Sequence, residues 1–82
     1  MKKDTHNFIH TYTGLGAYGM DRKTDEDTLK FYLQKFSEDA FLDLLAPRLS
    51  DKEIESIYMM INETLKKHLT EDEYHAVFLK DR

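Results

Sequence analysis

The residues most suggestive of chemistry are the three glycines, Gly14, Gly16 and Gly19, which spell the G-x-G-x-x-G pattern of dinucleotide-binding loops. In such a loop the glycines allow a tight turn against a pyrophosphate, inside a βαβ unit whose helix starts at once. Here the next strong helix start is Thr24, and no later segment has the pattern of a second parallel strand. We therefore expect no nucleotide cofactor and interpret the glycines as a bend with positive φ angles.

A second interpretation of the same loop is a binding site for a small anion or for the flat ring of a ligand. Tyr12 and Tyr18 supply aromatic rings next to the glycines, and Arg22 and Lys23 follow with positive charge. Aromatic faces attract cations and rings, and a turn with adjacent backbone N–H groups attracts anions. The alternative function of the chain is therefore a binder of a small ligand, an anion or a metal through this N-terminal segment.

The metal version of that alternative depends on His6 and His10. Their i, i+4 spacing would place two imidazoles on one face of a helix, as a metal site requires. Further ligands would have to come from elsewhere in the fold, and Asn7 stands where an HExxH motif has its glutamate. We therefore expect no metal centre, and keep His6 and His10 as the candidates.

No set of residues for catalysis is recognisable. The chain has no cysteine, and its serines lack the context of a nucleophile elbow. Most of the carboxylates fall at predicted helix starts or on polar helix faces, where they are solvated. We therefore expect a non-catalytic protein.

Composition and charge limit the classes of binding partner and the cellular location that we expect. The net charge of −4 divides into +2 over residues 1–23 and −6 over residues 24–82. Nucleic acid is held mainly by basic groups that meet phosphates, so the acidic part argues against that partner. No apolar run reaches the length needed to span a bilayer, and we expect no membrane partner. The lack of cysteine and of a visible export signal favours the cytoplasm.

The apolar spacing and the helix-start signals predict an all-α fold. Ser50 with Glu53, and Thr70 with Glu73, have the spacing of capping boxes; Thr24 with Asp27 has a similar spacing, and Ser37 offers a cap alone. In the arm, residues 5–13 fit either a short helix or an extended segment. We predict a single domain: a small, compact four-helix arrangement over residues 24–82, preceded by an N-terminal arm over residues 1–23. The four helices lie near residues 25–36, 38–47, 51–68 and 71–80.

Two apolar side chains fall away from the main stripes of these helices. At 100° per residue, Phe31 lies about 200° from Leu29, and Met59 lies about 140° from Ile54. An aromatic ring opposite a complete stripe indicates that something covers it. One cover for Phe31 is the arm, acting as a strap through an aromatic residue; the other is a second copy or another protein.

The interface interpretation gives the leading function. Met59 and Met60 suit a contact surface because thioether side chains adapt to a partner. We therefore expect a protein-interaction or regulatory module that self-associates, as a homodimer, or binds another protein. Its predicted contact residues are Phe31, Met59 and Met60.

Overall fold

The computed structural model describes residues 6–12, 18–19 and 21–82. These residues form helices and no strand, which confirms the all-α class. They fall into two units, an N-terminal unit, Thr5–Pro47, and a C-terminal unit that contains Arg48–Arg82, and each is described by itself. The predicted division at residue 23 stays a prediction.

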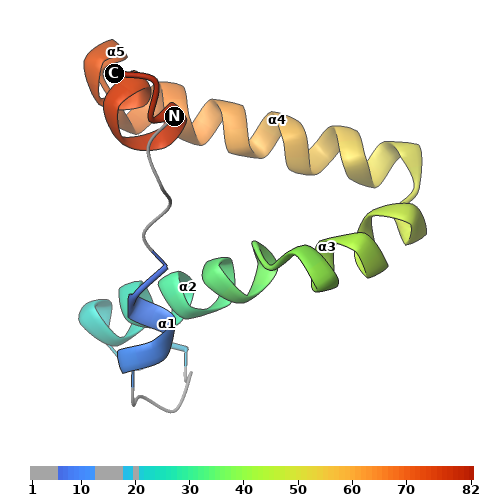
Figure 1. Ribbon diagram of the computed structural model, residues 1–82, viewed down its shortest axis with the longest axis horizontal. Helices are drawn as coiled ribbons and strands as arrows, with labels where there is room; N and C mark the ends of the chain where they lie inside the picture. The colour runs from blue at the N-terminus through green and yellow to red at the C-terminus, as the bar shows by residue number, and fades with distance from the viewer. Residues whose placement is uncertain (1–5, 13–17, 20) are drawn as a thin grey trace. The chain divides into compact units, whose positions relative to one another are not determined.

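In the N-terminal unit, the arm contributes the short helix α1 (Phe8–Thr11), which packs on helix α2 (Arg22–Phe36) (Figure 1). Of the two structures expected for residues 5–13, a short helix or an extended segment, Phe8–Thr11 therefore adopts the helix. The backbone N–H of Ile9 donates a hydrogen bond of 2.8 Å to Oε1 of Gln34 on α2. This bond satisfies one of the N–H groups that a four-residue helix leaves without an internal partner.

Helix α2 begins at Arg22, a few residues before the predicted start near residue 25. The predicted cap at Thr24 is wrong, because Asp21 is the N-cap and Thr24 is its donor. The Asp21 carboxylate accepts the backbone N–H of Thr24 at 2.8 Å and its hydroxyl at 3.1 Å. A carboxylate is favoured at this end of the helix dipole, and it takes up an orphan N–H group.

Helix α3 (Asp39–Leu45) continues into a 3₁₀ turn, η1 (Ala46–Arg48), that contains Pro47. The prediction that Ser37 caps this helix is wrong. Ser37 is the C-cap of α2, and its hydroxyl donates to the carbonyl of Gln34 at 2.9 Å. The N-cap of α3 is Glu38, whose side chain makes no capping hydrogen bond.

In the C-terminal unit, α4 (Asp51–His68) spans the predicted residues and has the predicted capping box. The Ser50 hydroxyl accepts the Glu53 N–H at 3.1 Å, and the Glu53 carboxylate accepts the Ser50 N–H at 2.8 Å. The last turn carries Lys66, Lys67 and His68, where cations suit the helix dipole.

The chain then forms α5 (Glu71–Glu73), which starts with a second capping box between Thr70 and Glu73, also as predicted. The helix widens into a π-helical segment, η2 (Tyr74–Leu79), and ends at Lys80 with a φ of 57°. Side chains tie the end of the chain back to this segment. Asp81 lies 3.1 Å from Nδ1 of His75, and Arg82 pairs with Asp72 at 2.6 Å.

In the part of the chain that the structure describes, neither unit by itself encloses an apolar core. Among the described residues, Thr28 is the single buried side chain, with 4% of its surface exposed, and no hydrophobic side chain is buried. A folded domain normally hides its large apolar side chains, so the apolar stripes predicted from the spacing form correctly but lack a cover.

Candidate interaction surface

The N-terminal unit has one uncovered apolar face, formed by α2 and α3 and here called the N-terminal apolar face. Phe36 and Phe41 join the two helices, with ring centroids 5.1 Å apart in an edge-to-face arrangement. Their rings, with Tyr32 and flanked by Lys35 and Glu38, line a hollow of about 400 Å³. The exposed members of this face are Leu29, Tyr32, Leu33, Phe36, Phe41 and Leu44.

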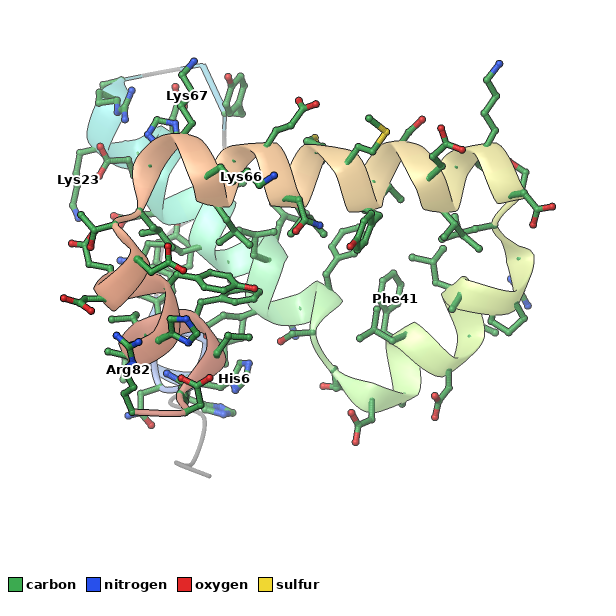
Figure 2. The ribbon with its side chains drawn as sticks, turned by 90° about the horizontal axis from the view of Figure 1, so that it is seen from above. His6, Lys23, Phe41, Lys66, Lys67 and Arg82 are labelled. Atoms are coloured by element: carbon green, nitrogen blue, oxygen red, sulfur yellow. The ribbon has the colours of Figure 1, made fainter. Side chains whose placement is uncertain are left out.

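The C-terminal unit has a second uncovered face along α4, here called the C-terminal apolar face. Its members, Ile54, Ile57, Tyr58, Ile61 and Leu65, follow helical spacing and so form one stripe. Tyr58 is 66% exposed and Ile61 is 44% exposed, whereas Leu65 at the end of the stripe is half-buried. Figure 2 shows the side chains along α4, with Lys66 and Lys67 at its basic end.

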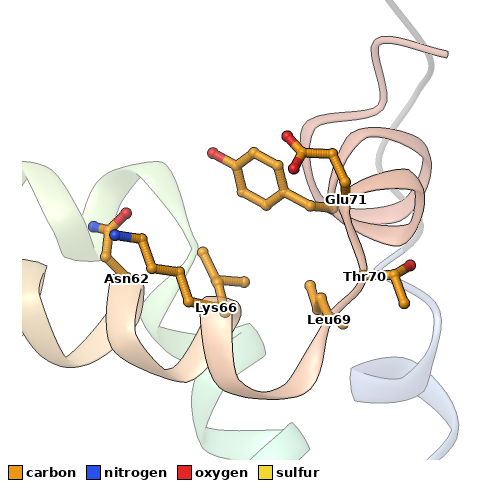
Figure 3. Close-up of a pocket in the computed structure, with 7 residues that line it drawn as sticks. Asn62, Lys66, Leu69, Thr70 and Glu71 are labelled. Atoms are coloured by element: carbon orange, nitrogen blue, oxygen red, sulfur yellow. The ribbon is translucent and has the colours of Figure 1, made fainter.

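A pocket of about 310 Å³ lies at the C-terminal end of this face. Leu65, Leu69 and Tyr74 give it apolar walls, and Asn62, Lys66, Thr70 and Glu71 line the remainder. Figure 3 shows Asn62 and Lys66 projecting from α4 and Glu71 at the start of α5. The pocket extends the apolar face and places one cation, Lys66, at its edge.

Contiguous exposed apolar faces differ from the scattered apolar residues that every protein surface carries. Single exposed leucines need no explanation, but a continuous face marks a contact site. Burying the exposed remainder of these side chains is favourable by roughly 25 cal/mol for each Å² removed from water. The chemistry that both faces support is therefore the binding of another apolar helix face.

Of the predicted contact residues, Phe31 is half-buried and is contacted by the arm. Its ring centroid lies 5.5 Å from that of Tyr12, which in turn stacks on Phe8 at 5.0 Å. Lys30 places its Nζ 4.2 Å from the Phe8 ring centroid, which closes this cluster with a cation. The arm thus provides the strap that was one of the two explanations for Phe31. Its role in binding a partner stays a prediction.

Met59 and Met60 are both exposed on α4, outside the C-terminal apolar face. They border a shallow, open surface together with Ser56, Glu63 and Lys67. Polar neighbours on this side give a partner less apolar area than the opposite stripe does. The two methionines as contact residues also stay a prediction.

The residues of the alternative ligand site are largely engaged with the chain itself. Arg22 pairs with Glu26 at 2.8 Å, and Lys23 pairs with Asp27 at 3.1 Å. Tyr12 packs between Phe8 and Phe31, whereas Tyr18 is 82% exposed. Three of the four residues therefore make contacts within the chain itself, and the ligand-binding function stays a prediction.

Gly19 and the start of α2, which follows it, both donate backbone N–H groups to carboxylates. Gly19 has a φ of 90°, as expected of a bend, and its N–H donates to Oδ1 of Asp25 at 2.7 Å. Asp21 occupies the helix N-terminus that follows. Two carboxylates thus stand where a phosphate would accept the same N–H groups, and they would repel it. Gly14 and Gly16 lie outside the described residues.

The helix cap at Asp21 and the ion pair between Arg22 and Glu26 shift the pKa values of these three side chains. The backbone N–H of Thr24, followed by its hydroxyl, lowers the pKa of Asp21 because both hydrogen bonds favour the charged carboxylate. The Arg22 guanidinium lowers the pKa of Glu26 by hydrogen bonding and charge, and Glu26 raises the pKa of Arg22 by the same contacts. Both acids are therefore held ionised, which suits caps and ion pairs and does not suit a proton donor.

His6 and His10 line a hollow of about 310 Å³ beside α1, together with Ser37 and Glu38. Nε2 of His6 lies 2.9 Å from the Ser37 hydroxyl, so this nitrogen is engaged by a hydrogen bond. Within the described parts of the chain, no group of three or more histidine or acidic side chains is placed to hold a metal ion. A metal at His6 and His10 would need ligands from outside these residues.

Sequence reasoning missed Asp21 as the N-cap of α2 and Asp25 as the acceptor of the Gly19 N–H. Asp21 stands three residues before Thr24, which is the spacing of an N-cap and its donor, so that signal was present in the sequence. The bond between Gly19 and Asp25 follows only from the turn geometry. Likewise, the spacing gives the apolar stripes, but only the structure shows that each unit leaves its stripe open.

Comparison with protein-family models, with curated proteins and with solved structures found no match. None of the described helices is long and apolar enough to cross a membrane.

Proposed function

We propose that this chain is a small helical interaction module that associates with itself through its apolar helix faces. One observation carries the proposal: both units leave a continuous apolar face exposed, while no hydrophobic side chain among the described residues is buried. In this function the chain performs no catalysis of its own and acts by forming an assembly. Its place is the cytoplasm, which the absence of cysteine favours.

The size of the faces supports an association that depends on concentration. All members of the C-terminal apolar face except the half-buried Leu65 keep 40% to 66% of their surface exposed, and burying that part contributes on the order of 1 kcal/mol for each. Two copies of the face, with four exposed members each, together contribute on the order of 8 kcal/mol. The loss of translational and rotational freedom costs about 4–15 kcal/mol, a range that includes this gain, so this face by itself supports a dimer of modest affinity at most.

The N-terminal apolar face adds to this association in one respect. Its aromatic hollow, lined by Tyr32, Phe36 and Phe41, has the shape that accepts a large apolar side chain as an anchor. Lys35 and Glu38 border it and supply both signs of charge at the rim. The rim therefore excludes neither an acidic nor a basic neighbour and leaves selection to shape and apolar area.

The test is the mass of the intact chain in solution across a concentration range, measured by sedimentation equilibrium. We expect the mass to rise from that of one 9.8 kDa chain to an integral multiple as the concentration increases. The contrary result is a chain that unfolds cooperatively and yet has the mass of one copy at every concentration. That result would refute the proposal.

A further inference from the structure

We propose that the C-terminal apolar face binds the same face of a second copy, with the two α4 helices antiparallel about a two-fold axis at the middle of α4. This inference rests on the proposed self-association and specifies its geometry. The partner surface is then α4 itself, and the interface is isologous, so every contact occurs twice.

The first argument is the spacing of the face. Ile54, Tyr58, Ile61 and Leu65 are separated by four, three and four residues, which is the repeat of a coiled-coil seam. The same four residues are symmetric about the middle of Asp51–His68. In an antiparallel pair centred there, Ile54 lies level with the partner copy's Leu65, and Tyr58 lies level with its Ile61. Every apolar layer therefore meets another apolar layer.

The second argument is the distribution of charge along α4. Acids are concentrated in its first turns, at Asp51, Glu53 and Glu55, and Lys66, Lys67 and His68 occupy its last turn. An antiparallel pair places the acidic end of each helix beside the basic end of the other. A parallel pair in register would place acids beside acids and lysines beside lysines, which is unfavourable. The charges therefore select the antiparallel orientation.

The third argument is that one opposite-charge pair lies on the correct edge of the face. At 100° per residue, Glu55 lies about 100° and Lys66 about 120° from Ile54, on the same side of the stripe. In the antiparallel pair their heights along the axis differ by about 3 Å, so each Glu55 reaches the other copy's Lys66. Lys66 stands at the edge of the pocket that extends the face (Figure 3). That pocket lies beside the layer in which Leu65 meets Ile54.

The chain has no cysteine, so single cysteines can report which residues are level with each other. The variants Ile54→Cys and Leu65→Cys are mixed in equal amounts under reducing conditions and then oxidised. We expect the disulfide between the two different variants to dominate over either homodimeric disulfide. Two copies of residue 54 would stand about 16 Å apart along the axis, whereas a disulfide needs Cα atoms within about 7 Å.

A matched pair on the other side of α4 is the control. Ser56 and Glu63 are also equally distant from the middle of the helix, but they lie about 200° and 180° from Ile54. The mixture of Ser56→Cys and Glu63→Cys should therefore form no preferred disulfide. Circular dichroism of each variant before mixing shows that it keeps its helix content.

A charge exchange tests the same geometry without altering the apolar seam. Glu55→Lys should weaken dimerisation roughly tenfold, because it sets a lysine beside Lys66 at two symmetric places. The double variant Glu55→Lys with Lys66→Glu restores the opposite charges and should return the dissociation constant to near its original value. Glu63→Lys makes the same change in net charge on the opposite side of α4 and should leave dimerisation unchanged.

The outcomes separate this inference from the proposed function. A dimer that forms homodimeric disulfides at residue 54 would overturn the antiparallel arrangement and leave self-association intact. A dimer with no preferred disulfide between residues 54 and 65, and with no response to Glu55→Lys, would place the interface elsewhere, for example on the N-terminal apolar face. A chain that is monomeric at all concentrations overturns both proposals.

Discussion

Truncating Ile61 to alanine removes a large apolar side chain from the middle of the C-terminal apolar face. The side chain is 44% exposed, so nearly half of its surface is still available for burial by a partner. Full burial of an isoleucine contributes about 1.5–3 kcal/mol, so the remaining part contributes about 1 kcal/mol for each copy. A symmetric dimer loses this twice, about 2 kcal/mol, which raises the dissociation constant roughly 30-fold.

The assay for this prediction is sedimentation equilibrium at a temperature well below the unfolding transition. The temperature matters because the buried part of Ile61 also stabilises the monomer, and Ile61→Ala should lower the free energy of unfolding by about 1 kcal/mol. Circular dichroism at the same temperature confirms that the variant is folded. The change in dissociation constant then reports association alone.

Met59→Ala is the matched control for this measurement. Met59 is 49% exposed and has a comparable size, but it lies on the other side of α4. We expect its truncation to leave the dissociation constant within about twofold of the original value, because a residue outside the interface contributes little. Weakening by Met59→Ala with no effect of Ile61→Ala would refute the assignment of the stripe and support the methionines predicted from the sequence.

Three further predictions concern the local structure that positions the faces. Ser50→Ala removes the capping box of α4 and should lower the free energy of unfolding by about 1 kcal/mol in a urea titration, whereas Ser56→Ala, within the same helix, should change it by less than about 0.5 kcal/mol. Gln34→Ala removes the acceptor of the Ile9 N–H and should speed hydrogen exchange at that amide, which otherwise stays protected. The pKa of Asp21 is lowered in the folded state, so its contribution to stability is present above the unfolded value of about 3.9 and is lost as the pH falls through the folded pKa. Asp21→Asn keeps a good cap and should flatten the acid side of the stability curve; an unchanged curve would show that this carboxylate is not a source of the pH dependence.

The helices themselves could be predicted from the sequence because their signals are local. A capping box depends on residues three positions apart, and an amphipathic stripe depends on neighbours one or two turns away. Both capping boxes, at Ser50 and at Thr70, form as predicted, and α4 spans its predicted residues. The cap predicted at Thr24 was wrong because the nearby Asp21 takes that role, and the cap predicted at Ser37 was wrong because α3 starts one residue later, with Glu38 as its N-cap. Helix α2 ends at Phe36, as predicted, and Ser37 is its C-cap.

The candidate site could be predicted only in part, because exposure is not a local property. Spacing identifies Ile54, Tyr58 and Ile61 as one stripe, but it does not say whether the unit covers that stripe. The same limit applies to Phe31, for which sequence left a strap and an interface as equal explanations. The Tyr12 ring packs on the Phe31 ring, and the Ile9 N–H bonds to Gln34 beside it. Both contacts join residues that are far apart in the chain.

The sequence by itself determined the all-α class, the positions of the long helices and the faces on which their apolar residues gather. These features follow from backbone hydrogen bonding and from side-chain periodicity, which act over a few residues. Only the tertiary structure decided that the arm straps Phe31, that Asp25 accepts the Gly19 N–H, and that each unit by itself leaves its apolar stripe uncovered. These features depend on contacts between residues far apart in the sequence, and the burial of a side chain is set by all of its contacts together.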